Sequence, residues 1–229
     1  MNNSNVLIIG ANSDLILPFI GQAPDRGLNM LQLTRKDWDL RDCMIPDNLL
    51  GQIIDFCPNH IVYAAGLNQI LNLKDVSRDS VLAMINHHLN VNCVSLLSLI
   101  LSLNEQLNYN LTSIHAISSL YGIYGRQTRL PYSLSKHALE GLVKCLALEM
   151  PETLVLGYRP GFFSTKLTEK NMSKEAQKKI VDRIPSGRFG TPSELSFVIL
   201  NNILTLPHYS SGSSITMDGA LTAGGLFTN

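Results

Sequence analysis

The fold is decided by residues 6–16, which read Val-Leu-Ile-Ile-Gly-Ala-Asn-Ser-Asp-Leu-Ile. A short apolar run is followed by a glycine turn and then by residues that suit the start of a helix. Glycine permits the tight turn, and free backbone amides at a helix N-terminus can hold a pyrophosphate. One glycine in such a turn is equally common without a ligand, so both interpretations stay open. The residues concerned are Gly10, Asn12, Ser13, Asp14 and Leu15, and Pro18 leaves the register of the helix open.

Similar apolar runs recur along the chain and alternate with stretches of helical periodicity. The runs are apolar throughout, which is typical of parallel strands that are buried on both faces. The pattern predicts an α/β fold, a doubly wound Rossmann-type three-layer sandwich around a parallel sheet. The expected strands are 6–9, 30–33, 61–64, 111–117, 154–158 and 214–217, and the expected helices are 48–56, 77–107, 131–150, 173–183 and 192–204.

The composition describes one neutral domain. The 229 residues carry 18 Lys and Arg against 18 Asp and Glu, and 45% of them are hydrophobic. This apolar content is enough for a large core, and no repeat or linker divides the chain, so a single domain over 1–229 is expected. Zero net charge removes the electrostatic case for nucleic acid or an anionic membrane as a partner.

Targeting and cysteine patterns agree with this description. No basic residue precedes the apolar run at 6–9, and the longest apolar stretch, 91–103, is shorter than the roughly 20 residues that span a bilayer. We therefore expect a soluble, cytoplasmic protein without a membrane segment. The cysteines form no Cys-x-x-Cys pair, so neither a metal site nor a disulfide framework is expected. We expect buried small hydrophobes at Cys43, Cys57, Cys93 and Cys145.

The expected second strand ends in Leu33-Thr34-Arg35-Lys36. In a dinucleotide-binding fold this end faces the adenosine ribose, where an acid accepts hydrogen bonds from the ribose hydroxyls and an arginine pairs with a 2′-phosphate. Neither Thr34 nor Arg35 is an acid, and two cations stand together. NADP is therefore favoured over NAD as the cofactor, while a solvated pair of cations is the alternative.

A tyrosine and a lysine stand four residues apart in Tyr132-Ser133-Leu134-Ser135-Lys136, within an expected helix. This spacing places both on one face of the helix, with the ammonium beside the phenol. A phenol titrates near pH 10, and an adjacent cation stabilises the phenolate and lowers that pKa. The pair is thereby suited to general acid/base catalysis. For the pair alone, two surface residues at chance spacing remain the alternative.

Further motifs surround this pair at fixed spacing. Ser119 ends an expected strand in Ile-Ser-Ser, thirteen residues before Tyr132. Together with the stretches 160–165, 184–194 and 211–219, this arrangement resembles the short-chain dehydrogenase/reductase family over nearly the whole chain.

The resemblance implies four catalytic residues. Tyr132 would exchange a proton with the substrate oxygen, and Ser119 would orient that oxygen by a hydrogen bond. Lys136 would lower the pKa of the tyrosine and hold the hydroxyls of the nicotinamide ribose. The fourth member is an asparagine of the preceding long helix that anchors a water; the candidates, best match first, are Asn92, Asn90 and Asn86.

The resemblance also implies cofactor contacts. The motif at 160–165 follows a strand and contacts the nicotinamide end, and the small residues at 64–66 let the backbone approach the adenosine. The acid that begins the segment at 39–42 is the one that bonds the adenine. The implied contacts are Pro160, Gly161, Phe163, Thr165, Ala64, Ala65, Gly66, Asp39 and Leu40, beside Tyr132 and Lys136.

The N-terminal half departs from the family pattern Thr-Gly-x-x-x-Gly-x-Gly, because Ile9, Asp14 and Ile16 replace the threonine and two glycines. A carboxylate at position 14 costs affinity for a pyrophosphate unless it caps amides or points away. Asp39 follows the second strand too soon for an intervening strand and helix, since a crossover takes a dozen or more residues. We therefore expect about six strands instead of the usual seven. Such shortening is similar to the sugar-nucleotide reductase branch of the superfamily.

The expected function is an NADP(H)-dependent oxidoreductase that reduces a carbonyl, or oxidises a secondary alcohol, of a small molecule. The alternatives are a sugar-nucleotide reductase or epimerase, and a non-catalytic dinucleotide-binding regulatory protein. The stretch 162–183 is expected to form a substrate lid. Family members pair through their long helices, so a homodimer or homotetramer is expected. The lid lysines, which either attract an anionic substrate or form a solvated face, are Lys166, Lys170, Lys174, Lys178 and Lys179.

Overall fold

The computed structural model describes residues 4–107, 111–166, 168 and 172–224. Its sheet has six strands in the order β2-β1-β3-β4-β5-β6, and every neighbouring pair is parallel. This confirms the Rossmann-type fold and the strand number that the shortened N-terminal half predicts. The strands are β1 (Ser4–Ile9), β2 (Leu28–Leu33), β3 (His60–Tyr63), β4 (Ser113–Ile117), β5 (Leu154–Pro160) and β6 (Ser214–Met217).

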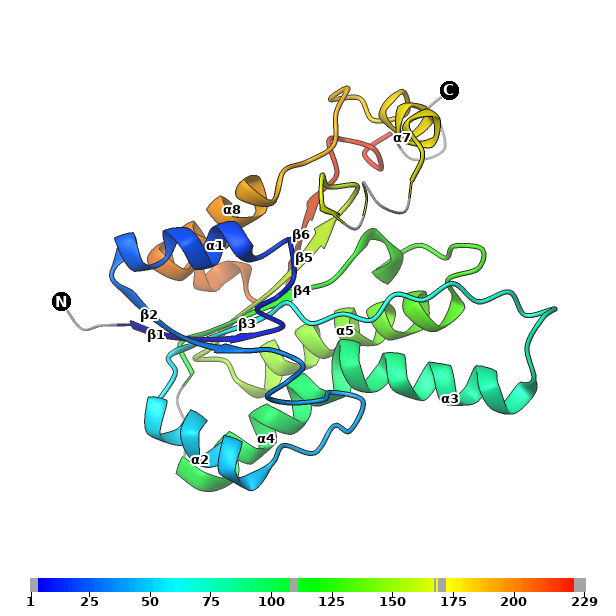
Figure 1. Cartoon of the computed structure of the whole chain (residues 1–229). Coiled ribbons are helices and arrows are strands. Elements are labelled where there is room, and N and C mark those ends of the chain that lie inside the picture. Colours follow the sequence, from blue (N-terminus) through cyan, green and yellow to red (C-terminus); the bar gives the residue numbers. More distant parts are fainter. Residues whose placement is uncertain (1–3, 108–110, 167, 169–171, 225–229) are drawn as a thin grey trace.

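Helices cover both faces of this sheet (Figure 1). In the figure, α1 and α8 lie on one face, and α2 to α5 lie on the other, while α7 lies beyond the ends of β5 and β6. The helices are α1 (Leu17–Gln22), α2 (Asp47–Phe56), α3 (Arg78–Leu89), α4 (Ser95–Leu107), α5 (Leu130–Glu149), α7 (Lys174–Val181) and α8 (Pro192–Thr205).

Two hydrophobic clusters explain why the strands are apolar throughout. Successive side chains of a strand point to opposite faces. In β1, Leu7 and Ile9 pack in the cluster under α2, α4 and α5, whereas Val6 and Ile8 pack in the cluster under α1 and α8. Both faces of the strand are therefore buried, and the chain has no reason to alternate apolar and polar residues there.

Residues 10–16 form the turn between β1 and α1. Helix α1 begins at Leu17 and not directly after Gly10, and Pro18 lies in its first turn. The intervening residues form turns in which Ser13 N–H donates to Gly10 O at 2.9 Å and Ile16 N–H donates to Ser13 O at 2.9 Å. The turn over 10–16 thus leads directly into a helix, as predicted, and Pro18 is tolerated in the first turn, where its missing backbone donor is not needed.

The long helix expected over 77–107 is interrupted. Ser77 caps its start by accepting from Ser80 N–H, and a π-helical segment, Asn90–Val94, joins α3 to α4. Single π turns are frequent at functional sites, because the wider turn redirects side chains. Asn92 and Cys93 in this segment are buried.

One helical stretch, Arg78–Glu105, is long and apolar enough by length and composition to cross a membrane. Core helices pass the same test, and this stretch packs in the core through Leu96, Leu99 and Leu103. The apolar character of the stretch is therefore accounted for by contact with the sheet.

The burial expected of the cysteines is wrong for most of them. Cys93 is buried, but Cys57 and Cys145 are exposed and Cys43 is half-buried; all four are free. Cys57 occupies the left-handed end of α2, with φ of 51°, which places its side chain outside the core.

Candidate active site

The tyrosine and lysine lie together at the start of α5. Lys136 is 3% exposed, and its Nζ lies 5.9 Å from the centroid of the Tyr132 ring. The Lys136 ammonium donates to Ile117 O, at the end of β4, at 2.7 Å. The interior of the protein thus holds this lysine against the end of the central strand.

Ser119 follows β4 and lies beside the same phenol. It is 7% exposed, caps the short turn Leu120–Gly122, and accepts from Tyr121 N–H at 3.2 Å. The Tyr121 ring meets the Tyr132 ring edge to face, with centroids 6.2 Å apart. Two residues that lie thirteen positions apart in the chain are thereby brought to one point, as the motif spacing predicts.

Asn92 reaches the site from the π segment. Its side chain accepts from Leu67 N–H at 2.6 Å and donates to Leu67 O at 3.0 Å and to Ser135 Oγ at 2.7 Å. Ser135 Oγ in turn donates to Tyr132 O at 2.8 Å. Asn92 therefore ties the loop after β3 to the helix that carries the tyrosine.

The two competing asparagines lie elsewhere. Asn90 donates to Arg41 O at 2.8 Å, and Asn86 is exposed on α3. Of the three, Asn92 alone is completely buried and next to Ser135 and Lys136, on the geometry of the described residues.

The electrostatics of Tyr132 differ from the expectation. Burial raises the pKa of Tyr132 above its ordinary value, and this outweighs the lowering by a hydrogen bond with Ser119 and by the charge of Arg129. The expected net lowering of the pKa of Tyr132 is wrong for this structure, because removal of the phenol from water disfavours the phenolate. Burial also lowers the pKa of Lys136 to about 8, although Cys93 and Glu140 act in the opposite direction.

Gly10 has a structural reason to be glycine. Its φ is 84°, and a Cβ there would lie 2.5 Å from Ala65 N and 2.8 Å from Ala64 C. The end of β1 thus approaches the segment after β3 closely, at the point where the strand order reverses and ligands bind in open α/β sheets. The backbone amides of Asn12, Asp14 and Leu15 have no acceptor among the described residues.

Asp14 is turned toward the lid. Its Oδ2 accepts from Lys166 N–H at 2.9 Å, across 152 positions of the chain. The carboxylate therefore caps a backbone amide of the expected lid segment.

The residues after β2 bond mainly to one another. Asp37 Oδ2 accepts from Thr34 N–H and from Thr34 Oγ1, both at 2.8 Å. Asp39 pairs with Arg41, which lowers the pKa of Asp39 to about 2, and Arg35 Nη2 lies 3.8 Å from the same carboxylate. Leu40 is buried, and its carbonyl accepts from Ser95 Oγ at 3.1 Å. Arg35, at the end of β2, therefore already has the Asp39 carboxylate beside it.

The motif at 160–165 lies at the end of β5. Pro160 is the last residue of β5, and Gly161 N–H donates to Met217 O at 2.9 Å. Phe163 is buried and pairs with Gly190 in an isolated bridge, and Thr165 Oγ1 lies 3.0 Å from Thr168 Oγ1. Beyond this point the expected lid contains α7, which has no buried residue. Lys166, Lys174, Lys178 and Lys179 are described, and Lys170 lies outside the described residues.

Sequence reasoning missed an ion pair behind the catalytic helix. Glu140 Oε2 accepts from Arg159 Nη2 at 2.7 Å and from Ser214 Oγ at 2.8 Å, and its side chain is 5% exposed. The ion pair joins α5 to β5, and the hydrogen bond from Ser214 joins α5 to β6. The four-residue step from Lys136 to Glu140 is the signal that could have found the first member of the ion pair.

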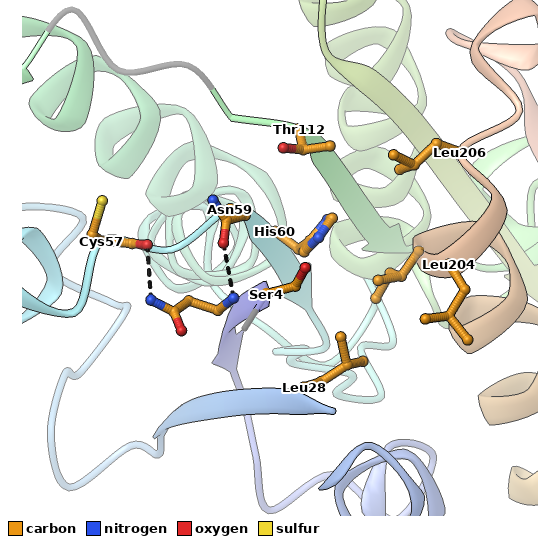
Figure 2. Close-up of a pocket in the computed structure, with 10 residues that line it drawn as sticks. Ser4, Leu28, Cys57, Asn59, His60, Thr112, Leu204 and Leu206 are labelled. Carbon is orange, nitrogen blue, oxygen red and sulfur yellow. Dashed lines mark hydrogen bonds between the residues drawn. The ribbon is translucent and has the colours of Figure 1, made fainter. Parts of the chain in front are cut away.

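The hollow shown in Figure 2 lies at the amino ends of the strands, opposite to the candidate site. Its volume is about 610 Å³, and it is bordered by the first residues of β1, β2 and β3 and by the end of α8. Ser4, Leu28, His60 and Leu204 are among its lining residues. None of the predicted site residues lines it, so the candidate site is the corner between β3, β4 and α5.

The fold and this corner define a class of protein, the Rossmann-type α/β scaffolds with a serine, tyrosine and lysine at the carboxyl ends of the strands. Residues 52–222 match the profile of a family described as Enoyl-(Acyl carrier protein) reductase. The chain belongs to the short-chain dehydrogenase/reductase family.

Individual relatives agree with this assignment. The chain is 38% identical over 111 residues to the 3-oxoacyl acyl-carrier-protein reductase FabG of Thermotoga maritima, which covers 48% of this chain and 45% of that protein. It is 35% identical over 117 residues to a tropinone reductase homolog of Arabidopsis thaliana, covering 49% of this chain and 44% of that protein. The matched region thus spans less than half the length of these curated relatives.

Solved structures extend the similarity in fold to nearly the whole chain. A 4-hydroxyisoleucine dehydrogenase mutant complexed with NADH and succinate superposes with a TM-score of 0.83 and 25% identity, covering 96% of this chain and 99% of that chain. A gluconate 5-dehydrogenase from Burkholderia cenocepacia in complex with NADP and tartrate superposes with a TM-score of 0.80 and 18% identity, covering 97% and 96%.

Proposed function

We propose that this chain is an NADP(H)-dependent oxidoreductase that reduces a carbonyl, or oxidises a secondary alcohol, with Tyr132 as the general acid/base. The observation that carries the proposal is the convergence of Ser119, Asn92 and Lys136 on Tyr132 in a buried, hydrogen-bonded corner. A non-catalytic scaffold has no chemical need for this set.

The residues at the carboxyl ends of the strands fit a dinucleotide. Gly66 is exposed there, and a Cβ at this position would lie 3.9 Å from Asn92 Oδ1 and 4.0 Å from Lys136 Nζ. An ammonium has three hydrogens, and Ile117 O is the single acceptor of Lys136 among the described residues. Two hydrogens therefore remain for the hydroxyls of a ribose. The free amides between Asn12 and Leu15 suit a pyrophosphate.

The catalytic residues have distinct roles in this proposal. Tyr132, kept neutral by burial, donates its proton to the carbonyl oxygen as that oxygen becomes a hydroxyl. Ser119 orients the oxygen by a hydrogen bond, and the charge of Lys136 stabilises the phenolate that remains. Asn92 holds the loop at Leu67 and the backbone of Tyr132 in register. The nicotinamide, when bound, supplies the hydride.

Arg35 supports NADP over NAD. It stands at the end of β2, its side chain is 71% exposed, and its guanidinium is free to pair with a 2′-phosphate at the cost of its long contact with Asp39. Structures of similar fold are described in complex with NADH, NADP and NAD, so a nicotinamide dinucleotide is common among them. The 2′-phosphate, which distinguishes NADP from NAD, is the part of the cofactor that rests on Arg35 in this proposal.

We also propose that the chain pairs with itself through the face of α3, α4 and α5. Exposed apolar side chains on these helices support this assembly, since a homodimer or homotetramer would cover them. They are Leu82, Leu101, Leu134 and Leu148. A cytoplasmic location and a single domain with a lid over 162–183 remain predictions.

The test combines a binding titration with a turnover screen. NADPH and NADH are titrated by fluorescence, and a panel of ketones, aldehydes and a keto-sugar nucleotide is screened with the native protein and with Tyr132→Phe. We expect tight NADPH binding by both and turnover by the native protein alone. Dinucleotide binding without turnover would favour the regulatory protein, and turnover confined to the sugar nucleotide would favour that branch. Absence of dinucleotide binding would refute the proposal.

A further inference from the structure

Two arginines stand in the loop that leads into the catalytic helix. Arg126 and Arg129 lie between Tyr121 and Tyr132, the two rings that meet edge to face. The guanidinium of Arg126 lies over the Tyr121 ring, 5.2 Å from its centroid, and bonds the Tyr121 hydroxyl. The proposed function does not use either arginine.

Arg129 is tied to the segment beside the reacting corner. It is the N-cap residue of α5 and stands three positions before Tyr132. Its charge reaches the phenol, because it lowers the pKa of Tyr132. Its Nη1 donates to Asn68 Oδ1 at 2.8 Å, and the adjoining residue Leu67 is held by Asn92.

The loop is fixed in a strained conformation around this arginine. Thr128 has φ of 63°, in the left-handed region that β-branched residues rarely occupy. Its carbonyl accepts from Leu71 N–H at 2.9 Å, and Arg129 N–H donates to Arg126 O at 3.1 Å. Strain of this kind persists only where the surroundings hold it, and it clusters at ligand sites. The guanidinium is therefore presented by a rigid frame.

The charge of Arg129 is uncompensated. Each ion pair of the described residues involves another arginine, namely Arg35, Arg41, Arg159 or Arg188. Among these residues, no carboxylate pairs with Arg129 or with Arg126, although the chain has 18 acids. One guanidinium nitrogen is used by Asn68, and the remaining donors form the planar edge that matches a carboxylate.

We propose that Arg129 determines specificity by binding a carboxylate of the substrate, so that the substrates are small keto acids and the corresponding hydroxy acids. This inference rests on the proposed function, since it names the substrate class of the same site. Reduction proceeds as described above, and Arg129 places the carbonyl beside Tyr132. Arg126, one ring further away, contributes a weaker attraction.

The test compares keto acids with their methyl esters. α-, β- and γ-keto acids and the matching esters are assayed with NADPH, using the native protein, Arg129→Gln, Arg129→Lys and Arg126→Gln. Arg26→Gln is the control, since Arg26 is exposed at the far edge of the sheet. A charge-assisted hydrogen bond to a carboxylate is worth enough to give the native protein a preference of about 10- to 100-fold in kcat/KM for one acid over its ester.

We expect Arg129→Gln to abolish that preference through a rise in KM for the acid, to leave KM for the ester unchanged, and to be partly rescued in Arg129→Lys. Arg126→Gln has a smaller effect, and Arg26→Gln has none. Equal losses for acid and ester in Arg129→Gln, or no native preference for any acid, would overturn the inference while ester turnover keeps the proposed function intact. Turnover of neither acid nor ester would overturn the inference, and the proposed function would then be judged by the wider carbonyl panel described above.

As a readout without turnover, binding of the preferred acid to NADPH-loaded Tyr132→Phe is measured by calorimetry. We expect affinity to fall about 10- to 100-fold when Arg129→Gln is added. Unchanged affinity would contradict the proposed contact.

Discussion

Two corners of the same sheet edge are built in opposite ways. In the proposed catalytic corner, defined by Asn92, Ser119, Tyr132 and Lys136, Tyr132 is half-buried and the other three side chains are buried. Asn92 and Lys136 are also hydrogen-bonded to other segments. In the nucleotide corner, defined by the turn 10–16 and the segment 34–41, the polar side chains are largely exposed and bond to one another. Under the proposed function, the buried geometry of one corner fixes the chemistry, whereas the exposed charges of the other set the affinity for the cofactor, which a few substitutions can adjust.

The largest effect is expected from Lys136→Met in the catalytic corner. It removes the buried ammonium, leaves Ile117 O without its donor and deprives the phenolate of its counter-charge. We expect kcat to fall about a thousandfold, measured by steady-state kinetics with NADPH. The control is Lys144→Met, exposed on the same helix, which should retain native turnover. A loss of less than tenfold in Lys136→Met would show that the corner is not catalytic.

Asn92→Ala should weaken both folding and turnover. It leaves Leu67 N–H and O and the Ser135 hydroxyl without the partner they have now, at a cost of about 2 kcal/mol in the free energy of unfolding. We also expect kcat to fall at least about tenfold, because 1.4 kcal/mol of lost positioning has that effect. Urea denaturation and kinetics measure the two effects. Asn86→Ala, exposed on α3, is the control; equal effects in both variants would contradict the role of the π segment.

Between pH 8 and 10.5, we expect catalysis and stability to change with pH in opposite directions. The pKa of Lys136 is lowered to about 8, so kcat/KM should fall about tenfold for each pH unit above that value, measured over pH 6 to 10. The unfolded chain keeps the ordinary value of 10.5 and binds more protons between the two, so this group makes stability rise with pH there.

A substitution at Glu140 should shift the pH at which kcat/KM begins to fall. Glu140 raises the pKa of Lys136, so Glu140→Gln should shift the fall in kcat/KM to lower pH. Glu149→Gln, exposed at the end of α5, should not. If the fall in kcat/KM occurs at the same pH in Glu140→Gln as in the native protein, a group other than Lys136 controls that fall.

In the nucleotide corner, Arg35→Ala should reduce the preference for NADPH over NADH about tenfold, since one ion pair to the 2′-phosphate is lost. The ratio of the two dissociation constants, from fluorescence titration, gives the answer. Lys36→Ala is the neighbouring comparison and should change the ratio less. A native preference for NADH would overturn the role given to Arg35.

The smallest effect is expected from Asp14→Asn. The amide oxygen can still accept from Lys166 N–H, while the negative charge near the pyrophosphate is removed. We expect the dissociation constant for NADPH to fall roughly threefold at low ionic strength, as for a screened charge at a surface. Asp25→Asn, exposed at the far edge, should leave it unchanged. Weaker binding in Asp14→Asn would show that the ionised carboxylate supports the cofactor site.

Much of the fold and of the catalytic corner could be predicted because the evidence for them is local. A step of four residues in a helix fixes the neighbourhood of Tyr132 and Lys136, and a strand end fixes Ser119. The choice of Asn92 over Asn90 depends on the π segment, which helical periodicity does not contain. The pairing of Glu140 with Arg159 also joins elements that only the folded chain brings together.

The nucleotide corner was predicted less well for the same reason. Asp14 finds its partner 152 positions away, which no local pattern reports. The direction of the pKa of Tyr132 was also wrong, because the spacing of Lys136 reports proximity, whereas burial, the larger influence, follows from the packing around α5.

The sequence by itself determined the six-stranded parallel sheet, the position of the serine, tyrosine and lysine at its carboxyl edge, and the family. The strands follow from short-range patterns that constrain the backbone directly, whereas the three site residues and the family follow from the resemblance of motifs at fixed spacing. The tertiary structure alone decided that Asn92, and neither Asn90 nor Asn86, lies next to Ser135, where Asp14 points, and that no carboxylate of the described residues pairs with Arg129. These depend on burial and on contacts between distant segments, which exist only once the layers have packed.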